Sequence, residues 1–193
     1  MKKTINILIG CILFQFGVQA QSKWAIDPVH SNIQFDVTHL VVSTVTGKFT
    51  EFSGTIDASG DTFDGAIAEV KVNVSSIDTE NLTRDKHLKE DDFFNAEAFP
   101  MISFKSTSFR KVNDKDYQLI GNLTIRDVTK EITISAVNNG TVNLGDKTIS
   151  AFKANFIINR FDYKLKWDDT LDSGSLVVGE EVAISMNLEL VKQ

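Results

Sequence analysis

The chain has 193 residues, with 20 basic and 26 acidic side chains and a formal net charge of −6. This length suits one domain with its own hydrophobic core, and the negative charge argues against nucleic acid and anionic membrane surfaces as partners. Cys11 is the single cysteine, so a disulfide within the chain and a zinc site built on several thiolates are excluded.

Residues 1–20 have the pattern of a secretory signal peptide. Lys2 and Lys3 precede an apolar stretch, and Val18 and Ala20 place small residues at the −3 and −1 positions of a cleavage site. The apolar stretch is too short for a stable membrane span. We therefore expect an exported protein, periplasmic or extracellular, whose mature domain is residues 21–193. Cleavage near Ala20 removes two lysines and no acidic residue, which leaves a net charge of −8.

A second interpretation of this segment is lipidation of Cys11, because residues 8–11 resemble a lipobox. Acylation there leaves residues 12–14, which are apolar, where a polar tether is expected. Cleavage after Ala20 is therefore the favoured interpretation, and it removes the cysteine.

Alternating apolar and polar residues predict β-strands along most of the mature chain. The first example places Ile33, Phe35, Val37 and His39 on one face of a strand. With this segment included, eight such segments occur along the chain: 32–40, 48–58, 66–74, 102–109, 117–125, 132–136, 152–158 and 182–190.

Residues 78–94 break the alternation and predict a short helix, with Asp78 as its N-cap and Leu82 and Leu88 near helical spacing. Pro100 then restarts an extended segment. About eight strands with one apolar face each, and one short helix between strands, indicate an all-β fold: a closed antiparallel barrel or a sandwich.

A barrel of eight strands is either filled by its side chains or just wide enough to hold one small ligand. Small residues on the apolar faces, such as Ala68, Ala136 and Ala154, alternate with phenylalanines, and the pattern is compatible with a lumen or with a solid core. The residues expected to line an apolar lumen are Phe35, Val37, Val70, Val72, Leu123, Phe152, Phe156 and Ile184.

A tubular lumen favours a chain-like ligand. Strands of nine residues span roughly 30 Å, and each buried methylene contributes about 0.8 kcal/mol. A long prenyl or acyl tail therefore offers more transfer free energy than its ordering costs, which are on the order of 10 kcal/mol.

The mature chain resembles the YceI-like family of secreted, lipocalin-like barrels that bind polyisoprenoid lipids. The resemblance rests on W-A-I-D-P-V-H-S-N-I-Q-F-D-V-T-H-L at 24–40, T-G-K-F-T-E-F-S-G-T-I at 46–56, S-S-I-D-T-E-N-L-T-R-D-K-H-L-K-E-D-D-F-F-N-A-E-A-F-P at 75–100 with I-S-F-K-S-T after it, G-N-L-T-I-R-D-V-T-K-E-I-T at 121–133, and F-I-I-N-R-F-D-Y at 156–163. The R-D-K-H-L core of the central block is the most specific part. Residues 167–181 match no part of the family pattern.

The resemblance implies an eight-stranded antiparallel barrel with an added helix and an apolar pore. It also implies a partner, an isoprenoid-type lipid such as a polyisoprenoid or a quinone-like molecule, with no other cofactor. Members of the family resemble carriers or reservoirs more than enzymes.

Four polar residues are candidates for contacting a lipid headgroup at the barrel mouth: His30, His39, Arg84 and His87. His39 lies on an apolar face, where an imidazole needs a hydrogen-bond partner from a headgroup or from the protein itself. His30 precedes that strand, at a rim or in a turn. Arg84 and His87 are three residues apart on the predicted helix, so they project from similar sides. They either grip a polar head or attach the helix to the barrel.

We assign no catalytic residue and no metal ligand, because the three histidines have no recognised metal spacing and no nucleophile motif is present. Two other functions stay open. One is a barrel with a filled core that acts through its surface as an interaction or stress-response protein. The other is an enzyme acting on a prenyl lipid with His39 or His87 as general base. A homodimer through an exposed strand edge is also left open.

Overall fold

The computed structural model describes residues 21–59 and 62–193, so the expected signal peptide and Cys11 lie outside the described residues. The described part of the chain is built mainly of β-strands. They are β1 (Gln21–Ile26), β2 (Asn32–His39), β3 (Ser43–Phe49), β4 (Phe52–Ser59), β5 (Ile67–Asn73), β6 (Ile77–Asp78), β7 (Met101–Lys111), β8 (Asp116–Ile125), β9 (Val128–Leu144), β10 (Lys147–Asn159) and β11 (Val178–Lys192). One α-helix, α1 (Leu82–Leu88), and two 3₁₀ turns, η1 (Val74–Ser76) and η2 (Arg160–Tyr163), complete them.

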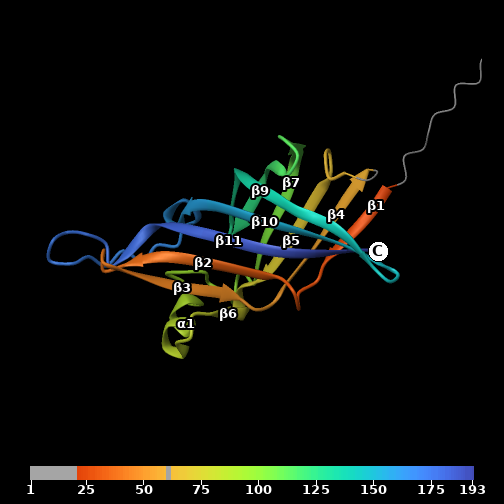
Figure 1. Ribbon diagram of the computed structural model, residues 1–193. Helices are drawn as coiled ribbons and strands as arrows, with labels where there is room; N and C mark the ends of the chain where they lie inside the picture. Colours follow the sequence, from red (N-terminus) through yellow and green to blue (C-terminus); the bar gives the residue numbers. More distant parts are fainter. Residues whose placement is uncertain (1–20, 60–61) are drawn as a thin grey trace, which may run out of the picture.

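Eight strands close a barrel in the order β1-β4-β5-β7-β8-β9-β10-β11, and β11 pairs back with β1. All of these pairings are antiparallel. The expected all-β, eight-stranded antiparallel barrel with one helix is therefore confirmed. Figure 1 shows the long strands β9, β10 and β11 extending well beyond the short β1 and β4.

Two strands, β1 and β2, share one edge of β11, and the end of the barrel away from β1 is called the open end below. The C-terminal part of β11 pairs with β1, from Leu190 to Lys192, and the rest pairs with β2 from Val178 to Asn187. Beyond β2 the sheet continues through β3 to β6, and α1 lies beside β3 and β6 in Figure 1. The sequence predicted one strand over 48–58, and the structure breaks it into β3 and β4 at residues 50–51.

Aromatic side chains fill the barrel at the β1 end. Phe63, from the segment between β4 and β5, has its ring centroid 5.1 Å from that of Trp24 and 4.9 Å from that of Phe152. Phe109 and Tyr117 join the cluster with an edge contact of 5.5 Å between ring centroids. Edge-to-face contacts of this kind add stability beyond the area they bury. This aromatic cluster closes one end of the barrel.

The helix is shorter than the sequence predicted. Asp78 belongs to β6 and its carboxylate accepts from the backbone N–H of Glu80, whose φ of +61° turns the chain before the helix. Asn81 is the N-cap instead, with Oδ1 accepting from the N–H of Arg84 at 3.0 Å. α1 then ends after two turns, and a series of turns carries the chain to Pro100. The prediction of a helix over 78–94 was wrong in both bounds.

The aromatic cluster predicts a large loss of stability when one of its rings is removed. Phe109 is 2% exposed, so Phe109→Ala leaves a cavity and lowers the free energy of unfolding by about 3–5 kcal/mol in urea denaturation. The control is Val112→Ala near the same strand, where a side chain 65% exposed costs less than about 0.5 kcal/mol. Equal effects of the two substitutions would contradict this packing.

Candidate functional site

An apolar cavity occupies the middle of the barrel and is called the inner cavity below. Its volume is about 190 Å³. Its wall comes from nearly every strand of the barrel, and Arg160 is the one polar residue among the residues that line it.

All eight residues that the sequence predicted for the lumen lie on this wall. They are Phe35, Val37, Val70, Val72, Leu123, Phe152, Phe156 and Ile184. Strand alternation explains the agreement, since residues two apart face the same side of a sheet. Ala68, Ala136 and Ala154 also line the cavity, and Ala136 pairs with Ala154 across β9 and β10. Small side chains there leave the space that a larger pair would fill.

The inward residues toward the open end are only half-buried, although they face the interior. Phe35, Val37, Phe156 and Ile184 belong to this group, whereas Phe152 at the closed end is 4% exposed. An inward apolar side chain stays accessible only where its neighbours do not meet across the barrel. The wall is therefore packed at one end and hollow toward the other.

A second cavity of about 180 Å³ adjoins the inner cavity at its open end. We call it the mouth. The two cavities share lining residues from β2, α1, β11 and the segment after α1: Phe35, Val37, Leu88, Phe93 and Val178. The mouth adds polar residues to this apolar set: His39, Thr79, Arg84, His87 and Trp167.

Three of the four polar residues predicted for a headgroup site meet at the mouth: His39, Arg84 and His87. The His39 ring is half-buried and makes no hydrogen bond to any described residue, so its ring nitrogens are available to a ligand. The alternative, a core histidine whose ring is hydrogen-bonded to the protein itself, does not fit this environment. Sequence parity placed His39 correctly, at the end of β2 where the barrel opens.

Arg84 lines the mouth and also holds the helix in place. Its Nε donates to Thr79 Oγ1 at 2.8 Å, and its Nη2 donates to the Thr79 carbonyl at 2.7 Å. Asp85, which is buried, accepts from the N–H of Thr79 at 2.9 Å and from its hydroxyl at 2.5 Å. The architectural role considered for Arg84 and Asp85 is therefore present, while Arg84 Nη1 donates to no described residue.

His87 is part of an aromatic corner. Its Nε2 lies 2.8 Å from Asp92 Oδ2, and its ring meets Phe93 and Trp167 edge-on at centroid distances of 5.0 and 6.0 Å. Phe93 and Trp167 stack on each other at 5.8 Å. The corner offers flat apolar faces beside a polar imidazole, which suits a ligand with a planar, polar head.

Arg160 fixes the chain between the mouth and the inner cavity. Its guanidinium is 2% exposed and donates to three backbone carbonyls, those of Leu165, Val178 and Gly179, at 2.8 to 2.9 Å. Burial lowers the pKa of Arg160 from its ordinary value, and the charges of Asp168 and Glu180 oppose that shift. Arginine side chains are not deprotonated in proteins, so the buried guanidinium keeps its charge.

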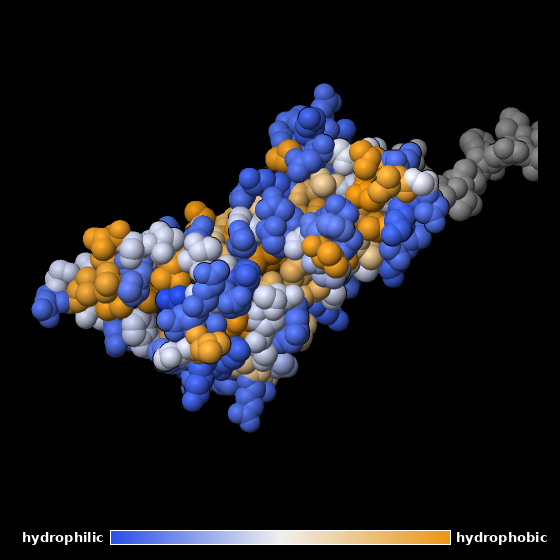
Figure 2. Space-filling view, turned by 60° about the horizontal axis from the view of Figure 1, so that its bottom comes forward, coloured by the Kyte–Doolittle hydropathy of each residue, from blue (hydrophilic) through white to orange (hydrophobic). Residues whose placement is uncertain are grey.

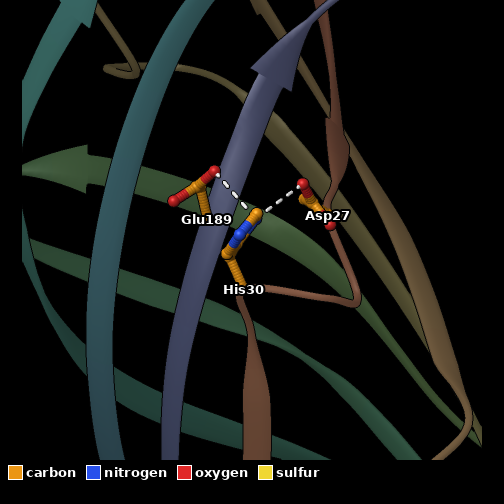
Figure 3. A group of neighbouring side chains, drawn as sticks. All are labelled: Asp27, His30 and Glu189. Atoms are coloured by element: carbon orange, nitrogen blue, oxygen red, sulfur yellow. Dashed lines mark hydrogen bonds and ion pairs between the residues drawn. The ribbon is translucent and has the colours of Figure 1, made fainter.

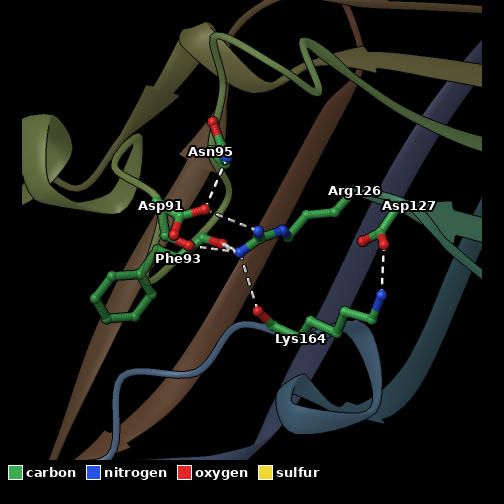
Figure 4. Close-up of polar contacts among 6 residues, drawn as sticks. All are labelled: Asp91, Phe93, Asn95, Arg126, Asp127 and Lys164. Carbon is green, nitrogen blue, oxygen red and sulfur yellow. Dashed lines mark hydrogen bonds and ion pairs between the residues drawn. The ribbon is translucent and has the colours of Figure 1, made fainter.

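Arg126 makes a similar attachment to the segment after α1 (Figure 4). Its side chain is 6% exposed, and Nη1 donates to the carbonyls of Asp91, Phe93 and Lys164 at 2.6, 2.7 and 3.0 Å. Nη2 is 3.1 Å from the Asp91 carboxylate. One guanidinium in the β8–β9 turn therefore positions both the segment after α1 and the segment after η2, which carry Phe93 and Trp167.

His30 does not join the mouth residues. It precedes β2, whereas His39 ends it, so about 30 Å of extended chain separates them. His30 Nδ1 lies 3.1 Å from Asp27 Oδ2 and 3.6 Å from Glu189 Oε1 (Figure 3). Asp27 and Glu189 raise the pKa of His30 above its ordinary 6.5, and the His30 hydrogen bond lowers that of Asp27 below 3.8. These three groups are close enough to hold a metal ion, and the ion pair already accounts for their arrangement.

Sequence reasoning missed Arg126, Arg160, Trp167 and Thr79. The two arginines occur in the sequences I-R-D-V and I-N-R-F, each directly after a strand with strong alternation. A single arginine at the end of an apolar strand was the sequence feature that could have indicated them. Trp167 stands in the stretch 167–181 that matched no pattern; the structure makes residues 167–177 a loop that leads into β11.

The protein is a closed antiparallel β-barrel with an apolar inner cavity that opens through a partly polar mouth. The described residues include no helix long and apolar enough to cross a lipid bilayer.

The chain belongs to the YceI-like family, because the family model described as the YceI-like domain matches residues 24–190. It is 35% identical to a UPF0312 protein of Shewanella denitrificans over 161 residues, which cover 81% of this chain and 82% of that one. A UPF0312 protein of Yersinia enterocolitica is 32% identical over 196 residues, covering 99% and 97%.

Solved structures share the fold. The Campylobacter jejuni YceI protein is 30% identical with a TM-score of 0.68, and the match covers 79% of this chain and 87% of that one. Burkholderia cenocepacia BcnA matches with a TM-score of 0.73 at 20% identity, covering 85% and 98%. A polyisoprenoid-binding domain from Saccharophagus degradans matches with 0.63 at 16% identity, covering 86% and 97%.

The pKa shifts at His30 predict a pH window for its ion pair. Protonated His30 stabilises the fold below the ordinary pKa of 6.5 and loses this effect as the pH rises through its raised pKa. Ionised Asp27 stabilises the fold above its ordinary pKa of 3.8, and this stabilisation is lost as the pH falls through its lowered pKa. His30→Gln should therefore lower the urea midpoint at pH 5 more than at pH 9.

The control is Lys105→Gln, which breaks the exposed Lys105–Glu69 pair. That lysine keeps its charge throughout the range, because its pKa is raised above 10.5. Its effect should be the same at pH 5 and pH 9. An effect of His30→Gln that also does not change with pH would exclude the ion pair.

Proposed function

We propose that this protein is exported, binds a long apolar isoprenoid-type lipid inside its barrel, and acts as a carrier or reservoir. The observation that carries the proposal is the inner cavity, an enclosed apolar space that continues into a polar mouth. The fold it shares with the polyisoprenoid-binding domain of Saccharophagus degradans supports the same ligand class.

The tail would lie in the inner cavity, against the eight wall residues predicted from the sequence. Each methylene buried there contributes about 0.8 kcal/mol of transfer free energy, so about a dozen carbons are needed to offset ordering costs on the order of 10 kcal/mol. A longer tail that continues into the mouth would supply the surplus that becomes affinity.

The head would lie in the mouth, where charge favours an uncharged polar group. Asp85 and Asp92 are held by Thr79 and His87 of the mouth, so their charges offset that of Arg84 and leave little positive charge for a diphosphate. The His39 imidazole supplies a hydrogen bond, and Trp167 supplies a flat face. A quinone-like ring with carbonyl acceptors uses both groups.

Binding is favoured over catalysis by the state of the polar groups at the mouth. Thr79, the hydroxyl residue in its wall, is already held by Asp85 and Arg84. His87 is held by Asp92, and His39 lies against apolar wall residues. A general base facing an activated nucleophile is not found among the described residues at the mouth.

Filling the inner cavity tests the proposal. Ala154→Phe places a ring on the cavity wall beside Ala136, and it should weaken binding of decylubiquinone at least tenfold, measured by quenching of tryptophan fluorescence. Overpacking costs roughly 1–3 kcal/mol of stability, so circular dichroism must show that the variant is folded. Ala68→Leu, a smaller change on the same wall, should give an intermediate effect.

The matched control is Ile157→Phe on the same strand, which adds a ring at an outward position that is 63% exposed. It should bind like the wild type. Native mass spectrometry of protein purified without detergent should also show a co-purified apolar molecule. Unchanged affinity of folded Ala154→Phe would refute a ligand in the inner cavity.

The mouth makes a separate prediction about the head. His39→Phe removes the hydrogen bond and keeps the ring, so it should weaken decylubiquinone binding about tenfold, as expected for one lost hydrogen bond of about 1.4 kcal/mol. It should leave the affinity for farnesene, which has no polar head, unchanged. Tighter binding of farnesyl monophosphate than of decylubiquinone to the wild type would show that the head is a phosphate.

A further inference from the structure

The turn between β2 and β3 exposes three consecutive aliphatic side chains at the open end of the barrel. Leu40, Val41 and Val42 are 39%, 59% and 87% exposed. We call these three residues the tip. Figure 2 shows hydrophobic side chains gathered at the narrow left end of the molecule, where Figure 1 places this turn and the loop before β11.

The backbone of the tip is one that aliphatic residues rarely adopt. Leu40 and Val41 have φ of +53° and +65°, and the N–H of Val42 donates to the carbonyl of His39. Hairpin turns with positive φ at both central residues strongly favour Asn-Gly, and a β-branched residue there is an outlier. Folding alone therefore does not explain why apolar side chains occupy this turn, and such strain is concentrated at functional sites.

The tip is continuous with the mouth. His39, which lines the mouth, directly precedes Leu40, and the N–H of Leu40 donates to the carbonyl of Val177 at 2.8 Å. Val178, the next residue, lines both the mouth and the inner cavity. A surface that received the tip would lie against the opening of the cavity.

We propose that the tip inserts into the surface of a lipid bilayer, so that a lipid passes between the bilayer and the mouth. This inference rests on the proposed function of lipid binding. A protruding turn needs no shape complementarity in a fluid bilayer. Its three side chains expose only a few hundred Å², well below the roughly 800 Å² that each partner of a standard protein interface buries.

Charge selects the kind of bilayer. The loop that contacts the tip carries exposed Asp168, Asp169 and Asp172, and the N–H of Val177 donates to the carbonyl of Asp169. Anionic lipid surfaces would repel this end of the molecule. The tip therefore fits a zwitterionic surface, such as phosphatidylcholine, entered by apolar side chains.

The experiment compares the mature protein with the variant L40N/V41G/V42T in flotation with phosphatidylcholine vesicles. The variant installs the sequence that the turn favours, so it should fold at least as stably as the wild type. We expect its vesicle-bound fraction, and its rate of delivering decylubiquinone to vesicles, to fall at least tenfold. Its affinity for decylubiquinone in solution should not change. Val42→Asp, which leaves the two central residues of the turn intact, should lose vesicle binding in the same way.

The matched control is V142T/L144T, which removes two exposed aliphatic residues, 61% and 68% exposed, near the β9–β10 turn. It should behave like the wild type. Vesicle binding that survives both tip variants, that requires anionic lipid, or that is absent from the wild type would overturn the proposal, as would self-association of the wild type through the tip. Failure of the wild type to bind decylubiquinone in solution would instead refute the proposed function.

Discussion

Hydrophobic packing inside the barrel is complete at one end and incomplete toward the other, and the remaining features follow from this asymmetry. At the β1 end, Phe63 turns inward and meets Trp24, Phe109 and Phe152, so the interior is as dense as an ordinary core. Beyond this cluster, Ala136 and Ala154 lie side by side on β9 and β10, and the inward residues Phe35, Val37, Phe156 and Ile184 are only half-buried. Side chains that line an unfilled apolar space lack van der Waals contacts on one side, and a bound hydrocarbon chain would supply them.

Buried hydrogen bonds fix the chain segments around the hollow end. Arg126 donates to the carbonyls of Asp91, Phe93 and Lys164, and Arg160 donates to those of Leu165 and of the first two residues of β11. Charged donors form stronger hydrogen bonds than neutral ones, so a few side chains can order long irregular segments. The mouth thereby keeps a fixed shape without filling the space that a ligand would occupy, and pre-organisation of this kind lowers the cost of binding.

Much of the barrel was predictable because β-strands have a period of two. Phe35, Val37 and Ile184 reach the cavity wall by parity alone, and parity also carried His39 to the mouth. Parity does not tell which end of a strand lies at the open end of the barrel, so His30 was grouped with His39 although β2 separates them. The helix was overextended because Glu80 adopts a left-handed conformation that its sequence does not signal. Arg126 contacts residues more than 30 positions away, and no local pattern records such contacts.

The central claim is that a hydrocarbon chain fills the inner cavity. It is tested most directly by a crystal structure of the protein purified from its native host without detergent. We expect continuous electron density for a chain that starts beside Ala136 and Ala154 and ends next to Trp167. Ordered water in the cavity, or aliphatic side chains that meet across it and leave no continuous space, would contradict the claim.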